Sequence, residues 1–208
     1  NSSKFYYNQS QIFNIPEINN IIFDPFIIDI CENYFDAPAY LSNIDMWWSP
    51  VKKKLKIENE IANRSAQYFH FDLDRIKWLK LFIYLTDTKL ESGPHEYVEG
   101  THGFSNKDKN LLNSGYQRIE EDLIYKKYNE KRIKKILGER GTMFIGDTSA
   151  FHRGALPKKE DRLLLVIEYS NSLFGGEYSK IETNKNINFK TNLMLKDKLE
   201  IKWKKYFI

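Results

Sequence analysis

The sequence predicts a mostly β protein, an antiparallel jelly roll of two sheets with helices at its start and in one insertion. Glycine and proline residues are spaced as turn markers between short apolar runs, which is typical of many strands within one domain. The strands follow one another without alternating with helices, and this order favours a jelly roll over an alternating β/α fold. A chain of 208 residues, 41% hydrophobic and without an internal repeat, fits one domain over 1–208, with its core at about 40–170.

A helical flank is expected before the sheets. Phe26, Ile27, Ile30 and Tyr34 have near-helical spacing, so the segment Asp24–Phe35 is predicted to form a helix. Its apolar side chains are expected to pack beside a sheet. The N-terminal part of the chain is therefore predicted to flank the β core.

Several short apolar segments have the length of strands. Leu79–Thr86 is nearly continuously apolar, as strands buried on both faces are, whereas Ala66–Phe71 is short and aromatic. Charged turn residues follow both segments, which supports their assignment as core strands. The predicted strands are Leu41–Trp48, Ala66–Phe71, Leu79–Thr86, His95–Val98, Arg132–Leu137, Thr142–Gly146 and Leu163–Tyr169.

One insertion and one extension accompany the predicted core. The polar stretch Ser105–Asn113 is expected to be a surface loop, and the spacing of apolar residues in Glu120–Tyr128 predicts a short helix. Because loops on rigid scaffolds often carry specificity, the insertion 105–130 is a candidate lid over a substrate. The C-terminal extension, 171–208, has a basic tail that is expected to pack against an edge of the core.

The composition excludes several classes of protein. The net charge of +4 is spread along the chain, so nucleic acid is not an expected partner. The apolar-rich segment Ile18–Ile28 is interrupted by Asn19, Asn20, Asp24 and Pro25 and is too short for a membrane span. A single cysteine, Cys31, cannot form an internal disulfide, and no secretory leader is visible, so a cytoplasmic location is expected.

Three residues have the chemistry and spacing of a metal site. His70 and Asp72 stand at i and i+2, so in a strand both side chains point to the same face. His152, just after a later predicted strand, can complete a set of two histidines and one carboxylate. Such a set leaves adjacent coordination positions open and is diagnostic of non-haem Fe(II) oxygenases. The alternative is a buried histidine beside a salt-bridged aspartate.

A charged residue begins the last predicted core strand. Arg162 precedes the apolar run Leu163–Ile167, and an arginine next to a buried region is normally paired or binds an anion. A bidentate contact with a carboxylate suits the guanidinium group. The alternative is that Arg162 lies in solvent and pairs with Asp161 or Glu160.

The chain resembles a known family over about half of its length, from Gln67 to Tyr169. The motifs that carry the resemblance occur in the family's order. They are Gln67-Tyr68-Phe69-His70-Phe71-Asp72, then Ser92-Gly93-Pro94 and Glu99-Gly100-Thr101-His102, then Gly146-Asp147-Thr148 with Phe151-His152-Arg153-Gly154, and finally Asp161-Arg162. The sequence is similar to the phytanoyl-CoA dioxygenase-like branch of the Fe(II)/2-oxoglutarate oxygenases. Glu99 and Ser92 depart from the residues usual in the family, and both positions are in predicted turns.

The resemblance implies a double-stranded β-helix core and a site. His70, Asp72 and His152 would be the iron ligands, and Arg162 would bind the distal carboxylate of 2-oxoglutarate. The implied reaction uses O2 to hydroxylate a small-molecule, glycan or lipid-type biosynthetic substrate, with succinate and CO2 as coproducts. Because related halogenases replace the acidic ligand by a small residue, the intact Asp72 favours oxidation over halogenation.

Other residues are further candidates for contact with the cosubstrate. Gln67 could donate a hydrogen bond to it or lie on the surface, and Lys80 could neutralise a carboxylate or extend into solvent. Gly154, in the motif around His152, is a further candidate for contact with the cosubstrate. His95 is expected to point into solvent or to lie at a sheet edge.

Two other function classes remain open for the predicted fold. The first is a catalytically inactive jelly roll that uses the site only for binding, although the retained ligands and Arg162 argue against it. The second is a cupin-type metal isomerase or hydrolase, in which Arg162 would have no evident role. Fold alone does not choose among substrates.

Overall fold

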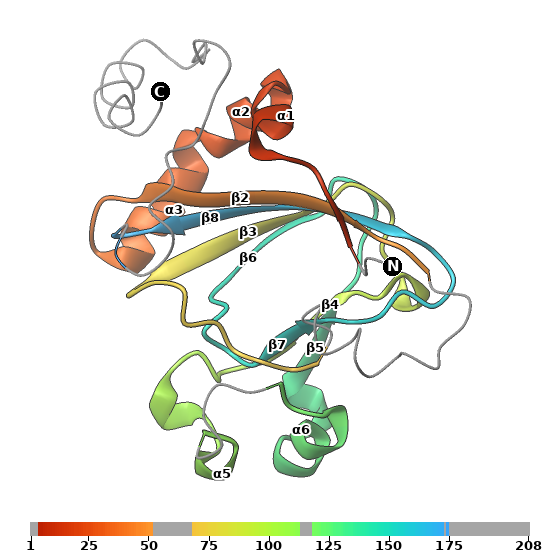
Figure 1. The fold of residues 1–208 in the computed structure, drawn as a ribbon. Helices are drawn as coiled ribbons and strands as arrows, with labels where there is room; N and C mark the ends of the chain where they lie inside the picture. Colours follow the sequence, from red (N-terminus) through yellow and green to blue (C-terminus); the bar gives the residue numbers. More distant parts are fainter. Residues whose placement is uncertain (1–3, 52–67, 113–117, 173, 175–208) are drawn as a thin grey trace. The chain divides into compact units, whose positions relative to one another are not determined.

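The fold contains two β-sheets, as the sequence predicts. The computed structural model describes residues 4–51, 68–112, 118–172 and 174. One sheet has the strand order β1-β2-β8-β3-β6 and the other has the order β5-β4-β7 (Figure 1). The strands are β1 Phe5–Tyr6, β2 Tyr40–Ser49, β3 Trp78–Tyr84, β4 His95–Val98, β5 Ile133–Ile136, β6 Met143–Gly146, β7 His152–Gly154 and β8 Arg162–Ser170.

The chain divides into two compact units. The first unit comprises 1–5, 47–73 and 82–164, and it contains the whole three-stranded sheet. The second unit comprises 6–46, 74–81 and 165–208. Each unit is assembled from three separate chain segments, so neither corresponds to a continuous stretch of sequence.

The second unit contains the N-terminal helices α1 Gln9–Phe13, α2 Pro16–Ile22 and α3 Pro25–Phe35. The predicted helix is confirmed as α3, which begins because the Asp24 side chain accepts hydrogen bonds from the backbone N–H groups of Phe26 and Ile27. Pro25 occupies the first turn, where its missing N–H costs nothing.

The buried face of α3 differs from the predicted one. Phe26 is 73% exposed, and the buried side chains are Ile27, Ile28, Cys31 and Phe35. Two adjacent isoleucines allow the apolar stripe to be placed on either side of the helix, so spacing alone does not fix which face packs inward.

Most predicted strands are confirmed within one or two residues at each end, but the predicted strand Ala66–Phe71 differs, and strands β1 and β7 are not predicted. In the predicted strand Ala66–Phe71, only Phe69 and His70 form bridges, each with a distant residue, and 66–67 lie outside the described residues. Strand β7 was missed because its three residues, His-Arg-Gly, show no apolar alternation.

The insertion contains more helix than the sequence predicts. The expected loop Ser105–Asn113 includes part of the 3-10 turn Phe104–Asn106 and the helix α5 Lys109–Leu112, while 113–117 lie outside the described residues. The expected helix in Glu120–Tyr128 is confirmed as α6 Glu121–Lys127. Short 3-10 turns also occur at Leu90–Ser92 and Glu130–Arg132.

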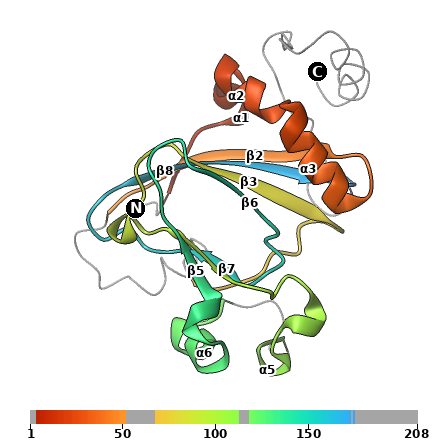
Figure 2. The same ribbon diagram turned by 180° about the vertical axis from the view of Figure 1, so that it is seen from behind.

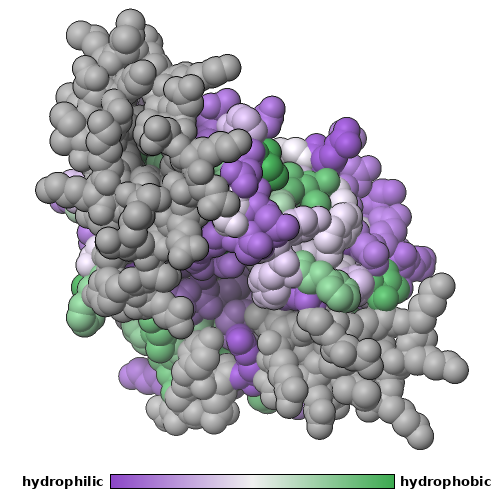
Figure 3. Space-filling model, turned by 45° about the horizontal axis from the view of Figure 1, so that its top comes forward, coloured by the Kyte–Doolittle hydropathy of each residue, from purple (hydrophilic) through white to green (hydrophobic). Residues whose placement is uncertain are grey.

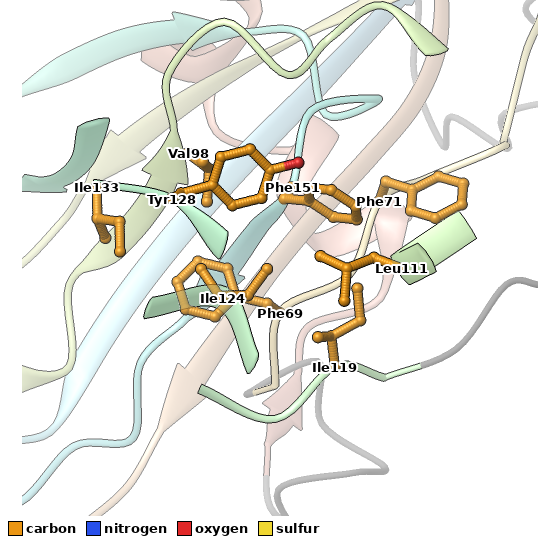
Figure 4. Close-up of a cluster of buried hydrophobic side chains, with 9 residues drawn as sticks. All are labelled: Phe69, Phe71, Val98, Leu111, Ile119, Ile124, Tyr128, Ile133 and Phe151. Carbon is orange, nitrogen blue, oxygen red and sulfur yellow. The ribbon is translucent and has the colours of Figure 1, made fainter. Parts of the chain in front are cut away.

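Helices α5 and α6 lie beside the three-stranded sheet in both ribbon views (Figures 1 and 2). Leu111 of α5 and Ile124 of α6 belong to a buried cluster with Val98 of β4 and Phe151 (Figure 4). The described part of the insertion therefore contributes to the core of the first unit. The cluster comprises Phe69, Phe71, Val98, Leu111, Ile119, Ile124, Tyr128, Ile133 and Phe151.

The surface of the described residues is mixed in character. On the face drawn in Figure 3, hydrophilic colouring covers most of the atoms that are not grey, with smaller hydrophobic areas between them. None of the helices in the described ranges has the length and hydrophobicity that a membrane crossing requires. The basic tail of the C-terminal extension lies outside the described residues.

Candidate metal centre

His70, Asp72 and His152 come together in the first unit. Their potential ligand atoms all lie within 4.8 Å of one another. The Nε2 atom of His70 is 3.6 Å from Oδ1 of Asp72, and Nε2 of His152 is 3.7 Å from Oδ2 of the same carboxylate. All three residues are at most 9% exposed. The arrangement provides two imidazole nitrogens and one carboxylate for a single ion.

Main-chain hydrogen bonds fix the positions of the three ligands. The backbone N–H of His70 donates to the carbonyl of His152 at 2.9 Å, and the N–H of His152 donates to the carbonyl of His70 at 2.8 Å. This antiparallel bridge places the imidazole centroids 4.3 Å apart. The N–H of Asp72 donates to the carbonyl of Thr148 at 2.8 Å, which ties the third ligand to the same neighbouring segment.

The tautomers of both histidines suit metal binding. Nδ1 of His70 lies 2.9 Å from the carbonyl oxygen of Tyr68, and Nδ1 of His152 lies 2.9 Å from that of Ala150. A carbonyl oxygen only accepts hydrogen bonds, so Nδ1 carries the proton and donates in each ring. The Nε2 atoms, which face Asp72, therefore carry the lone pairs. A hydrogen bond from Nδ1–H to a carbonyl oxygen is the contact that normally orients a metal-binding imidazole.

Burial keeps an imidazole of this site neutral. The pKa of His70 is lowered well below its ordinary value, mainly because burial disfavours the charged ring and secondly because His152 is close. Asp72 opposes this shift but does not reverse it. A neutral imidazole is the form that binds a metal ion.

Arg162 is buried in the same unit, at 3% exposure. Within the described residues, its Nε and Nη1 atoms have no hydrogen-bond partner. Burial lowers the pKa of its guanidinium to about 10, with a smaller opposing effect of Tyr84, so the group stays charged at neutral pH. A buried cation with two nitrogen atoms that lack a hydrogen-bond partner has the properties of a binding site for an anion.

The solvent-exposed alternative for Arg162 is wrong. Asp161 accepts a hydrogen bond from the backbone N–H of Val51 at 2.6 Å, and Glu160 accepts one from the hydroxyl of Ser92 at 2.9 Å. Arg162 itself is directed away from solvent and begins β8 as a buried residue.

Gly154 leaves space for Arg162. A Cβ atom at Gly154 would lie 3.1 Å from Nη2 of Arg162, closer than most Cβ contacts in proteins. A side chain there would require the guanidinium group to shift by a few tenths of an ångström, and the predicted contact of Gly154 with the cosubstrate stays a prediction.

His95 and Tyr97 also line this site, and the prediction that His95 lies in solvent or at a sheet edge is wrong. His95 is 5% exposed on β4, the central strand of its sheet, opposite Gly154 of β7, and Tyr97 is opposite His152. The His95 ring is 5.4 Å from the His152 ring, and the Tyr97 ring is 5.8 Å from it. Their same-face spacing, i and i+2 in a predicted strand, is the sequence signal that could have identified the pair.

The opposite face of β7 carries a buried ion-pair group. Nε of Arg153 donates to Glu96 at 2.7 Å, and its Nη1 donates to Glu121 of α6 at 2.9 Å. Because side chains alternate along a strand, Arg153 points away from the face that carries His152. This group links α6 to the three-stranded sheet.

The structure places Lys80 in the second unit, among acidic residues. Its Nζ atom is 2.8 Å from Asp74 and 3.4 Å from Glu168. Glu168 also contacts Arg75 at 3.2 Å and accepts from the hydroxyl of Ser42 at 2.6 Å. These contacts give Lys80 a structural role within its own unit. Gln67 lies outside the described residues.

Solved structures share this fold. HygX from Streptomyces hygroscopicus, crystallised with nickel and 2-oxoglutarate, matches with a TM-score of 0.57 at 17% identity over 83% of this chain and 72% of that chain. SnoK, a non-haem α-ketoglutarate-dependent carbocyclase from nogalamycin biosynthesis, matches with a TM-score of 0.56 at 17% identity over 80% of this chain and 64% of that chain. EctD from S. alaskensis, crystallised with 2-oxoglutarate and 5-hydroxyectoine, matches with a TM-score of 0.54 at 15% identity over 81% of this chain and 56% of that chain.

These similarities establish the fold, a mostly β protein with a jelly-roll core. No protein-family model and no curated protein matches the sequence. The chemistry of the site therefore follows from its own residues.

Proposed function

We propose that this chain is a non-haem Fe(II) enzyme that uses 2-oxoglutarate and O2 as cosubstrates. The observation that carries the proposal is the buried guanidinium of Arg162, with two unpaired nitrogen atoms, in the same unit as the His70, Asp72 and His152 ligands. The ligand set suits Fe(II), and the guanidinium suits the free carboxylate of a dicarboxylic acid bound to the metal at its other end. HygX and EctD, which share the fold, were crystallised with 2-oxoglutarate.

Each residue has a distinct task in this proposal. Bound Fe(II) supplies the activation of O2. His70, Asp72 and His152 would hold the ion, and Arg162 would orient the cosubstrate by its distal carboxylate. The rings of Phe82 and Phe144 stack at 4.9 Å, with Phe82 4.4 Å from His95, and together they keep this region apolar.

We further propose that the oxidation is a hydroxylation, as in the phytanoyl-CoA dioxygenase-like branch. The intact carboxylate of Asp72 supports it, because an acidic ligand occupies the position that a halide ion would need. A small-molecule, glycan or lipid-type biosynthetic substrate is the proposed target. HygX has also been crystallised with hygromycin B, a small-molecule ligand.

An anaerobic titration tests the proposal. Metal-free protein receives Fe(II) and then 2-oxoglutarate, and the visible charge-transfer band that forms when a 2-oxo acid chelates iron is recorded. The band is expected in the wild type and lost in Asp72→Ala. Folded protein that binds the metal but gives no band with 2-oxoglutarate would favour a binding module or a cupin-type isomerase or hydrolase.

A further inference from the structure

Buried polar atoms without partners gather around the proposed cosubstrate site. Among the described residues, they include Nε and Nη1 of Arg162, Nε2 of His95 and the hydroxyl of Tyr97. A buried polar atom left without a hydrogen bond costs free energy, and such atoms at a site are often satisfied by a ligand. The proposed function already uses Arg162, and it does not yet use His95 or Tyr97.

His95 lies between the metal ligands and Arg162. On one side, its ring stacks on His152 with centroids 5.4 Å apart and planes 17° apart. On the other side, its partner across the strands is Gly154, and Nη2 of Arg162 lies 3.1 Å from the Cβ position of that glycine. A dicarboxylic acid that reaches from the metal to Arg162 therefore passes His95.

The position of His95 is fixed by its surroundings. Its backbone N–H donates to the hydroxyl of Tyr84 at 3.0 Å, and that hydroxyl donates to the carbonyl of Ile136 at 2.8 Å. Phe82 and Tyr97 pack against the ring, with centroids 4.4 and 4.5 Å away. A ring held in this way can present Nε2 without losing side-chain freedom when a ligand binds.

We infer that His95 is a second binding residue for the distal carboxylate of the 2-oxo acid, with its Nε2–H donating to the carboxylate alongside Arg162. The inference rests on the proposed function and adds to it a residue that selects dicarboxylic over monocarboxylic 2-oxo acids. A neutral imidazole with the proton on Nε2 is a donor, and a carboxylate accepts several such bonds.

The test compares two acids that differ at the distal end. The anaerobic band is titrated with 2-oxoglutarate and with pyruvate, which has no distal carboxylate, in wild type, His95→Leu and His95→Gln. His95→Leu is expected to weaken 2-oxoglutarate binding about ten- to a hundredfold, the effect of one hydrogen bond to a charged group, and to leave the pyruvate affinity within about twofold. His95→Gln keeps a donor and is expected to recover part of the lost affinity.

Controls separate the possible failures. His102→Leu makes the same change at an exposed histidine of the same unit and should bind both acids as the wild type does. Thermal unfolding and Fe(II) affinity of each variant check that the site is assembled, and His95→Gln serves if His95→Leu does not fold. No band in the wild type would overturn the proposed function itself. A wild-type band with equal 2-oxoglutarate affinity in His95→Leu, or an equal loss for both acids, would overturn the role of His95 alone.

Discussion

His70 and His152 donate their backbone N–H groups to each other's carbonyls, at 2.9 and 2.8 Å. The imidazoles are therefore brought together by the main chain, and the bridge does not depend on the side chains that would bind the ion. The two imidazoles are therefore brought together whether or not a metal ion is bound. Substitution of a ligand side chain is expected to leave the fold of the site largely intact.

The first prediction concerns that separation. His152→Ala removes a ligand but keeps the backbone bridge, so the metal-free variant is expected to fold with a near-wild-type far-UV circular dichroism spectrum. Its affinity for Fe(II) should fall by at least about a hundredfold. Loss of a residue that only hydrogen-bonds to a metal ligand typically lowers metal affinity about 10- to 100-fold, and loss of the ligand itself should lower it more. Isothermal titration under anaerobic conditions measures the affinity. Full turnover in this variant would contradict the ligand assignment.

A second prediction concerns the stability of the buried cation. Arg162→Met replaces an unpaired buried charge by an apolar side chain of similar length, so the metal-free protein should unfold at the same temperature or a higher one, with a gain of up to roughly 1–4 kcal/mol. The same variant should lose 2-oxoglutarate binding in the charge-transfer assay. A large loss of thermal stability would indicate a structural partner for the guanidinium group.

A third prediction concerns the helices of the insertion. Ile124 is fully buried in the cluster of Figure 4, whereas the neighbouring Leu123 is 44% exposed. Ile124→Ala should lower the free energy of unfolding by about 2–5 kcal/mol, and Leu123→Ala should change it by about 0.5 kcal/mol or less. Urea unfolding measures both. Because the insertion contributes to the core, a lid role of 105–130 has to be tested by substitution of exposed residues and not by deletion.

A fourth prediction concerns acid sensitivity. Burial lowers the pKa of both His70 and His95 below the ordinary value of 6.5, so the unfolded chain binds protons that the folded protein does not. The stability that the two neutral histidines contribute is fully present above the pKa of histidine in the unfolded chain. The free energy of unfolding falls as the pH drops below about 6.5, by up to about 1.4 kcal/mol per pH unit for each histidine. Unfolding of the metal-free protein between pH 7.5 and about 5 checks the slope. His95→Leu should reduce it, and an unchanged slope would contradict the contribution of His95.

The sequence predicts best those site residues whose chemistry is unusual for their position. His70, Asp72 and His152 come together as expected, and Arg162 begins a buried strand, because polar groups beside long apolar runs need a specific reason. His95 was misplaced because the burial of a short strand depends on what covers it, and tertiary packing decides that.

The elements that were missed or misjudged have a common physical cause. Strand β7 has three residues and no apolar pattern, so local propensity could not identify it. The insertion was expected to be a polar loop, yet Leu111 turns inward from α5 and joins the buried cluster. In both cases, contacts with distant segments determine the structure.

The alternation of side chains along β7 has a consequence for how this protein can change. His152 faces the proposed metal centre, while Phe151 and Arg153 face the core cluster and Glu96 on the other side. A shift of one residue in the register of β7 would exchange the two faces, bringing a guanidinium to the metal and an imidazole into the core. Insertions and deletions should therefore be tolerated poorly between Thr148 and Gly154, even where single substitutions are accepted.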